Sequence, residues 1–257
     1  MTPMQQMFLG GGKPLTTWET NKPSWMPMES SVPAPYSWYD WENRGDWAGD
    51  GHNTNNKWYD RSGNGRLSEI SGGQRSTTGT GRNLSASVDC WRWPTTSSTS
   101  QIITGWPGNA DVTMIHMTSY DASSGTDARM WQANGTSGSH NWFIGHWESG
   151  TGRYYMGNGF LEQSADIGNV FAVHYAEITN VSSYGAGMLQ SNGTQNNYDA
   201  TDGGNGVWPT SAVGISMNNG PYGEPSTGDC IFIGIWDGRL TATQRNTVLT
   251  AAKNNYL

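Results

Sequence analysis

The sequence is poor in charge, in lysine and in cysteine, and each shortage excludes a class of protein. Only 14% of its 257 residues are charged, the net charge is −7, and its four lysines are scattered along the chain. Because no cluster of Lys and Arg exists, nucleic-acid binding through a basic patch is not expected. Cys90 and Cys230 are too few for a disulfide framework, and the choice between two buried thiols and a single disulfide stays open.

Long apolar stretches are missing as well. No run reaches the length that a membrane span requires, so we expect no membrane contact. The opening residues, MTPMQQMFLGGGKPL, contain neither a charged region nor an apolar core of the kind that marks a signal peptide. We therefore expect the chain to be synthesised and folded in a cytoplasm.

Glycine and aromatic residues are abundant instead, with 35 Gly, 14 Trp and 11 Tyr. Gly and Asn supply turn positions with positive φ, and aromatic side chains suit pleated, half-buried surfaces. About a dozen short segments with strand character alternate with turn signals, and no internal repeat is visible. This pattern predicts a single all-β domain built as a sandwich or barrel.

Helical character is confined to the end of the chain. Thr241 and Gln244 form a T-x-x-Q capping box, directly after Leu240. An apolar stripe at helical spacing follows, made by Val248, Leu249, Ala252 and Tyr256. We predict one short C-terminal helix that packs against the sandwich and has a structural role.

Residues 1–34 differ from the rest because proline and methionine are concentrated there. Proline at this density disfavours helices and central strands, so we expect an extended arm ahead of a domain that spans residues 35–257. The arm could pack on its own domain or anchor the chain to a partner. The second role is our working prediction, with four anchoring residues, Phe8, Leu9, Trp18 and Trp25.

Three motifs resemble those of concanavalin A-like, laminin-G-like jelly rolls. KWYDRSGNG (57–65) is similar to the W-x-D-x-S-G-N-G signature near the start of that domain, and MLQSNGTQ (188–195) is similar to a later hairpin. IFIGIWDGRLTATQRNTVLTAAKNNYL (231–257) resembles the family's last strand, turn and helix. The resemblance runs in order over residues 36–257. It implies a two-sheet antiparallel jelly-roll sandwich whose last helix closes one end.

The opening M-x-x-x-F-L-G-G-G pattern resembles the start of virion structural proteins of tailed bacteriophages, especially marine ones. This resemblance covers about a dozen residues. It implies a non-enzymatic protein on the virion surface, a knob-like capsid decoration attached by its arm to other virion proteins such as the major capsid protein.

Catalytic motifs were sought and not found. Glycoside hydrolases on the jelly-roll fold resemble one another in an E-x-D-x-x-E strand, because retaining chemistry needs two carboxyl groups about 5–5.5 Å apart. This chain has no such motif, and Glu177 lies mid-strand without an acidic neighbour two or four residues away. We expect no enzymatic activity, and a polysaccharide hydrolase that uses Glu177 remains the second alternative.

No cofactor or metal is expected. His140 and His146 flank one strand, and His116 and His174 lie on others; such residues are more often hydrogen-bonded within a sheet than bound to metal. The loop most suited to calcium contains four oxygen-bearing residues whose spacing is equally ordinary for a turn, namely Asp46, Asp50, Asn53 and Asn55.

Sugar binding is the first alternative function, as a carbohydrate-binding module or a fibre head that recognises host glycans. Its candidate stacking residues lie on the middle strands, namely Trp131, Trp142, Trp147 and Tyr155. These rings could instead fill the core between the two sheets. The choice depends on strand register, because a shift of one residue moves each ring to the opposite face.

Overall fold

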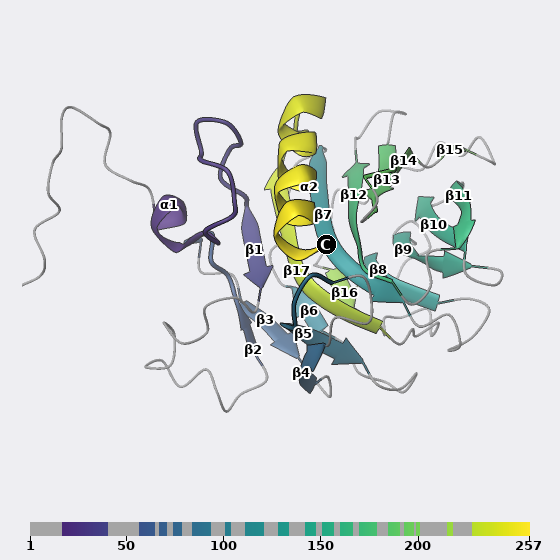
Figure 1. The fold of residues 1–257 in the computed structure, drawn as a ribbon, viewed down its shortest axis with the longest axis horizontal. Helices are drawn as coiled ribbons and strands as arrows, with labels where there is room; N and C mark the ends of the chain where they lie inside the picture. The colour runs from purple at the N-terminus through teal and green to yellow at the C-terminus, as the bar shows by residue number, and fades with distance from the viewer. Residues whose placement is uncertain are drawn as a thin grey trace, which may run out of the picture.

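A computed structural model of the chain describes most of its regular elements. The described residues are 17–40, 57–64, 67–70, 74–78, 84–93, 101–103, 111–120, 128–133, 142–147, 151–156, 160–166, 170–178, 185–190, 193–197, 199–200, 215–217 and 228–257. They form two antiparallel sheets and two helices (Figure 1). No helix among these residues is long and apolar enough to cross a membrane.

The first sheet has eight described strands, in the order β14-β13-β12-β7-β17-β5-β4, with β1 paired to β17. They are β1 (Ser37–Asp40), β4 (Gln74–Thr78), β5 (Val88–Trp93), β7 (Val112–Tyr120), β12 (Ala172–Ile178), β13 (Gly185–Leu189), β14 (Gln195–Asn197) and β17 (Gly228–Asp237).

The second sheet has nine described strands, in the order β15-β11-β10-β9-β8-β16-β6-β3-β2. They are β2 (Lys57–Tyr59), β3 (Leu67–Ile70), β6 (Gln101–Ile103), β8 (Ala128–Ala133), β9 (Trp142–Trp147), β10 (Thr151–Met156), β11 (Phe160–Asp166), β15 (Asp199–Ala200) and β16 (Ile215–Met217). The two-sheet antiparallel sandwich is confirmed, with more strands than the dozen expected.

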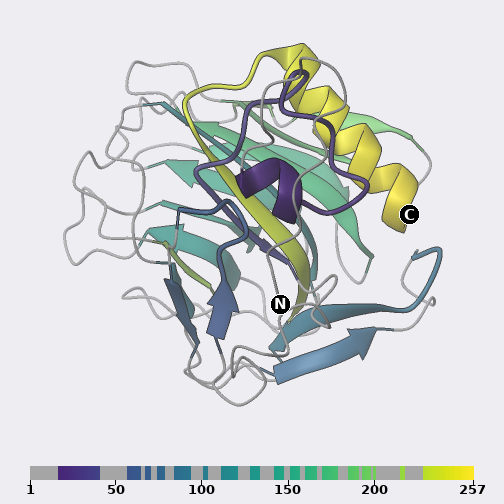
Figure 2. The same cartoon turned by 90° about the vertical axis from the view of Figure 1, so that its left-hand side faces the viewer.

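The central strands of the first sheet are buried on both faces. Every residue of 112–119, 171–177 and 228–236 is buried, so these strands read as nearly continuous apolar runs. We call the face that carries Ile115, Met117 and Phe232 the outer face, and the face that carries His116 and Ile233 the inner face. The outer face is covered by the C-terminal helix and by residues 18–36, which Figure 2 shows in front of β17. The inner face is left to the second sheet.

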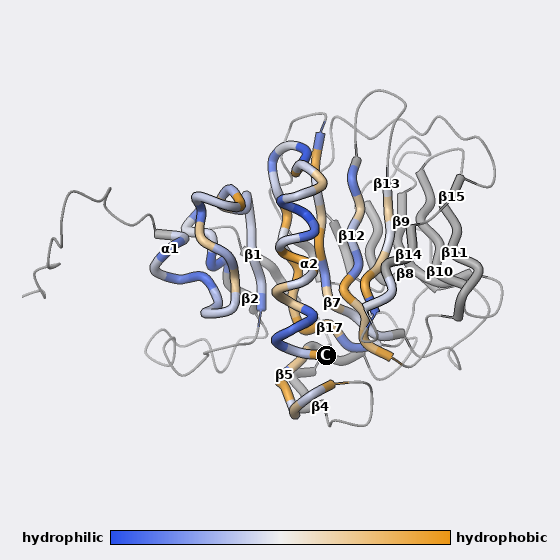
Figure 3. Tube along the Cα trace, turned by 45° about the horizontal axis from the view of Figure 1, so that its top comes forward, coloured by the Kyte–Doolittle hydropathy of each residue, from blue (hydrophilic) through white to orange (hydrophobic). Residues whose placement is uncertain are grey.

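The C-terminal helix α2 (Ala242–Tyr256) forms as expected. Thr241 accepts a hydrogen bond from the backbone N–H of Gln244, and the Gln244 side chain accepts one from the Thr241 N–H, which completes the capping box. The predicted apolar stripe is buried, and Figure 3 shows hydrophilic and hydrophobic turns alternating along the helix. Helix α2 thus covers one part of the outer face.

The N-terminal segment packs on the outer face of the first sheet. Residues Thr17–Asn21 form a short helix, α1, and the chain from residue 22 to 36 then crosses the outer face through turns. Trp18 is 1% exposed and packs on Trp38 with ring centroids 5.6 Å apart. Trp25 packs on Phe232 at 5.3 Å. Trp18 is part of the chain's own core and Trp25 packs against that core, and a role of either residue in anchoring a partner stays a prediction.

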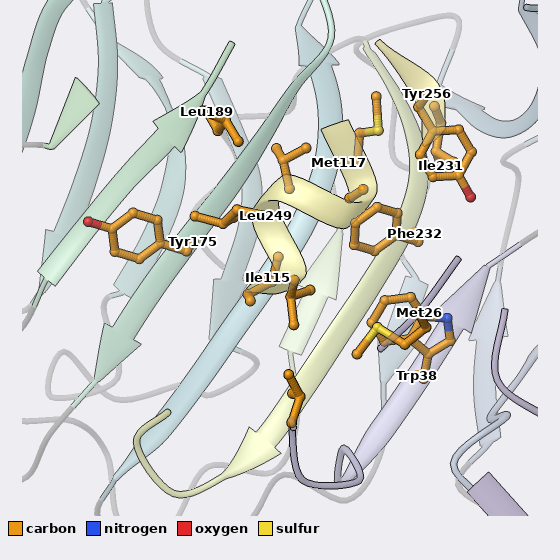
Figure 4. Close-up of a cluster of buried hydrophobic side chains, with 14 of the residues drawn as sticks. Met26, Trp38, Ile115, Met117, Tyr175, Leu189, Ile231, Phe232, Leu249 and Tyr256 are labelled. Carbon is orange, nitrogen blue, oxygen red and sulfur yellow. The ribbon is translucent and has the colours of Figure 1, made fainter. Parts of the chain in front are cut away.

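Packing contacts cross the predicted boundary at residue 34. Met26 and Val32 belong to the same buried cluster, and Figure 4 shows Met26 together with side chains from β1, β7, β12, β13, β17 and α2. The Trp236 indole donates to the carbonyl of Pro33 at 2.8 Å, which ties the segment to β17. Phe8 and Leu9, the other two predicted anchors, lie outside the described residues.

The turn after β2 holds the start of the domain together. Asp60 accepts hydrogen bonds from the backbone N–H of Trp38 at 2.9 Å and from Ser62, while the Asn64 side chain donates to the carbonyl of Tyr36 at 2.9 Å. Gly63 has a φ of 87°, which favours glycine at this turn. The D-x-S-G-N part of the first motif is therefore a structural connection between this turn and β1.

Candidate functional site

Glu177, the carboxylate weighed as a catalytic acid, is held between two arginines. It lies on the outer face at the end of β12, and its side chain is 2% exposed. One oxygen accepts from Arg245 of α2 at 2.5 Å, and the other accepts from Arg239 at 3.0 and 3.2 Å. The Arg245 guanidinium also lies over the Tyr175 ring, 4.3 Å from its centroid.

This ion pair network fixes α2 to the sheet and leaves Glu177 no room for substrate. Both carboxylate oxygens are engaged, and the segment that supplies Arg239 is itself tied down where Leu240 N–H donates to Thr113 Oγ1 at 2.9 Å. A buried carboxylate paired in this way is a structural element, since its charge is stabilised only while both arginines stay in place. The geometry gives Glu177 a role in stability.

His116 and His174 form a stacked pair on the inner face. They are direct register partners on β7 and β12, and their rings lie 5.0 Å apart at an interplanar angle of 12°. His116 Nδ1 is 3.1 Å from Thr118 Oγ1. Burial lowers the pKa of His174 to about 4, partly opposed by a hydrogen bond with the Thr118 backbone, and burial together with His174 lowers the pKa of His116. The pair is therefore neutral at pH 7.

No metal centre accompanies this pair within the described part of the chain, where no three His, Cys, Asp or Glu side chains are placed to share an ion. The calcium candidates Asp46, Asp50, Asn53 and Asn55 lie outside the described residues, as does His140.

Cys90 and Cys230 are both buried and not joined by a disulfide. They lie on neighbouring strands, but Cys230 is the register partner of Trp91, so alternation puts the two cysteines on opposite faces of the sheet. Burial, with smaller contributions from Cys90 and Asp229, raises the pKa of the Cys230 thiol. This thiol is therefore a poor nucleophile.

The four aromatic residues proposed for sugar stacking all lie in the second sheet, on three neighbouring strands, but the register divides them. Trp131 is the partner of Ile144, which shares its face with Trp142. Tyr155 is the partner of Phe143, which shares the opposite face with Trp147. Because side chains alternate along each strand, the four residues cannot line one binding surface. Sequence alone did not give this division, since it depends on the pairing between strands.

Comparison with known proteins identifies the fold. No protein-family model and no curated protein matches the chain. Trypanosoma rangeli sialidase in complex with 2,3-difluoro-KDN matches with a TM-score of 0.61 and 7% identity, over 86% of this chain and 33% of that one. The receptor binding domain of botulinum neurotoxin mosaic serotype C/D matches with a TM-score of 0.55 and 6% identity, over 84% and 50%.

A third structure matches over nearly its whole length. Domain 4 of AbnA, an extracellular arabinanase from Geobacillus stearothermophilus solved with arabinotriose, has a TM-score of 0.54 and 11% identity, over 84% of this chain and 98% of that one. This chain therefore spans about a third of the sialidase, half of the toxin structure and almost all of the arabinanase domain. At these identities the matches establish a lectin-like β-sandwich and nothing finer.

We expect Glu177→Gln to lower the free energy of unfolding by about 3 kcal/mol, because it leaves Arg245 buried without its charge partner. Urea denaturation measures this change. Arg239→Gln is the matched control, and it should cost less than about 1 kcal/mol because the Arg239 side chain is 49% exposed. A Glu177→Gln variant as stable as Arg239→Gln would contradict the structural role.

We also expect stability to fall on acidification between pH 6.5 and about 4. In this range the unfolded histidines bind protons and the folded ones do not, because their folded pKa values are depressed. Each histidine should then add a slope of up to about 1.4 kcal/mol per pH unit, with stability rising as pH rises. Unfolding curves of the wild type and of His116→Gln/His174→Gln measure it. Equal slopes for the two proteins would show that the pair is not responsible.

Proposed function

We propose that the chain is a non-catalytic carbohydrate-binding module. The observation that carries the proposal is the match to a complete domain, domain 4 of AbnA, whose solved structure contains a trisaccharide. The sialidase structure in complex with 2,3-difluoro-KDN supports the same class of ligand, and the match to a toxin receptor binding domain supports a binding role. Aromatic residues on the second sheet supply the chemistry that such binding needs.

Binding would depend on a rigid platform. Aromatic rings present an apolar surface that suits the C–H faces of a sugar ring, and nearby amide and hydroxyl groups can hydrogen-bond its rim. The first sheet, whose central strands are buried on both faces, keeps the second sheet in a fixed shape, so little ordering is required when ligand binds. With Glu177 held by arginines, we propose that the bound sugar is released unchanged.

A glycan array followed by calorimetry with the best ligand tests this function. We expect saturable binding to one glycan class, and no release of reducing sugar during prolonged incubation. The Glu177→Gln variant serves as the control, because it should keep sugar affinity under conditions in which it remains folded. Absence of binding to any glycan on the array would overturn the proposal.

Display on a phage particle is the second proposal, which would make the module a capsid decoration that recognises host glycans. It is supported by the opening residues with Phe8 and Leu9 and by the fixed C-terminal end, where Ser85 donates to the Tyr256 carbonyl at 2.8 Å. In this proposal the segment before residue 17 is the tether.

Mass spectrometry of gradient-purified particles tests the display. We expect tens to hundreds of copies relative to the major capsid protein, whereas absence from particles would overturn the display and leave the binding module unaffected.

A further inference from the structure

The two faces of the second sheet differ in charge. Following the register from strand to strand assigns every paired residue to one face or the other. All the charged Lys, Arg, Asp and Glu residues of the nine strands fall on one face, which we call the polar face; they are Lys57, Glu69, Arg129, Arg153, Glu162, Asp166 and Asp199.

The opposite face, which we call the apolar face, carries none of them. Its members are mostly large and apolar, and include Trp58, Ile70, Ile103, Trp131, Trp142, Ile144, Tyr154, Met156, Leu161, Ile215 and Met217. A sheet in a sandwich places its apolar residues against the other sheet and its polar residues toward solvent. The apolar face is therefore the one that meets the inner face of the first sheet.

This assignment separates the four aromatic candidates by role. Trp131 and Trp142 lie on the apolar face, which this assignment turns toward the first sheet. Trp147 and Tyr155 lie on the polar face. Tyr155 is directly opposite Phe143 on β9 and Phe160 on β11, so three aromatic residues form a row across three strands. Aromatic residues gathered on the face that also carries the charged residues of the sheet commonly mark an interaction site.

The row and Trp147 are spaced along the strands with polar residues between them. Trp147 is four residues from Phe143 on β9, which corresponds to about 13 Å at the rise of a β-strand. The register row of Gly145, Arg153 and Glu162 crosses the sheet between them. The arrangement therefore offers two aromatic positions, one at each end of a strip of hydrogen-bonding residues.

We propose that the polar face of β9, β10 and β11 is the saccharide site and that its ligand is a neutral oligosaccharide. The inference rests on the carbohydrate-binding function proposed above. Sugar rings stack on Trp147 and on the aromatic row, and Arg153 and Glu162 hydrogen-bond the hydroxyls between them. A neutral chain is favoured because the chain has a net charge of −7 and the acidic residues of the polar face outnumber its basic ones. The acidic residues are Glu69, Glu162, Asp166 and Asp199, and the basic ones are Lys57, Arg129 and Arg153.

Alanine substitutions on the polar face test the proposed site, and matched substitutions on the apolar face serve as controls. Trp147→Ala and Tyr155→Ala should each weaken binding of the best neutral glycan by about tenfold or more in calorimetry, with an unchanged melting temperature. Trp131→Ala and Trp142→Ala, the matched aromatic controls on the apolar face, should lower the melting temperature instead. Loss of affinity in the apolar-face variants while the polar-face variants bind normally would overturn the site.

Two further measurements separate this inference from the function on which it rests. If the wild type binds no glycan, the proposed function fails. Oxidation of the folded protein by N-bromosuccinimide still tests which face of the second sheet is exposed to solvent. Trp147 should react before Trp131 and Trp142, and the reverse order would overturn the assignment. If the wild type prefers anionic to neutral glycans, or if Tyr155→Ala changes the oligomeric state in place of affinity, the neutral-saccharide site is wrong.

Discussion

Trp38 is the residue on which the described core depends. Its ring stacks on Phe232 at 4.9 Å and 12°, and it also contacts Trp18, Trp25 and Trp236. This packing is possible because residue 234, its register partner on β17, is a glycine; a Cβ there would lie 2.5 Å from the Trp38 ring. The backbone N–H of Trp38 is meanwhile held by Asp60. One ring thus joins Trp18 and Trp25 of the N-terminal segment to β17.

This packing has a consequence for function. Residues 112–119, 171–177 and 228–236 of the central strands are buried on both faces, so this part of the first sheet offers no surface for a ligand. A sugar that binds a sheet surface then fits the second sheet better, on the face turned away from the first. The site proposed on the polar face of β9, β10 and β11 meets this condition.

Features that depend on residues close together in the sequence could be predicted from it, whereas contacts between distant segments could not. The capping box of Thr241 and Gln244 spans three residues, and alternation along β12 correctly placed His174 apart from Tyr175. The packing partners of Trp18 and Trp25 could not be predicted, since composition identifies an apolar segment without showing what it packs against. Their partners, Trp38 and Phe232, are defined only by tertiary structure.

The residues of the candidate site were even harder to predict from the sequence, because they lie on different strands. Alternation within β9 separates Trp142 from Trp147, but only the pairing of β9 with β10 shows that Trp147 and Tyr155 share a face. The charged residues carried a usable signal, because they also alternate, yet their common face emerges only when neighbouring strands are aligned. A binding surface assembled across strands is therefore invisible to any single-segment pattern.

The motifs that resemble concanavalin A-like domains all belong to the scaffold. Asp60 and Asn64 tie a turn to the start of β1, and the motif around α2 supplies Arg239, Arg245 and the cap. None of them includes Trp147, Tyr155 or Arg153. The residues that specify the fold are thus separate from those proposed to contact a ligand, so the binding face can change while the sandwich is retained. This separation explains how a chain with 6–11% identity to its structural neighbours can keep their fold.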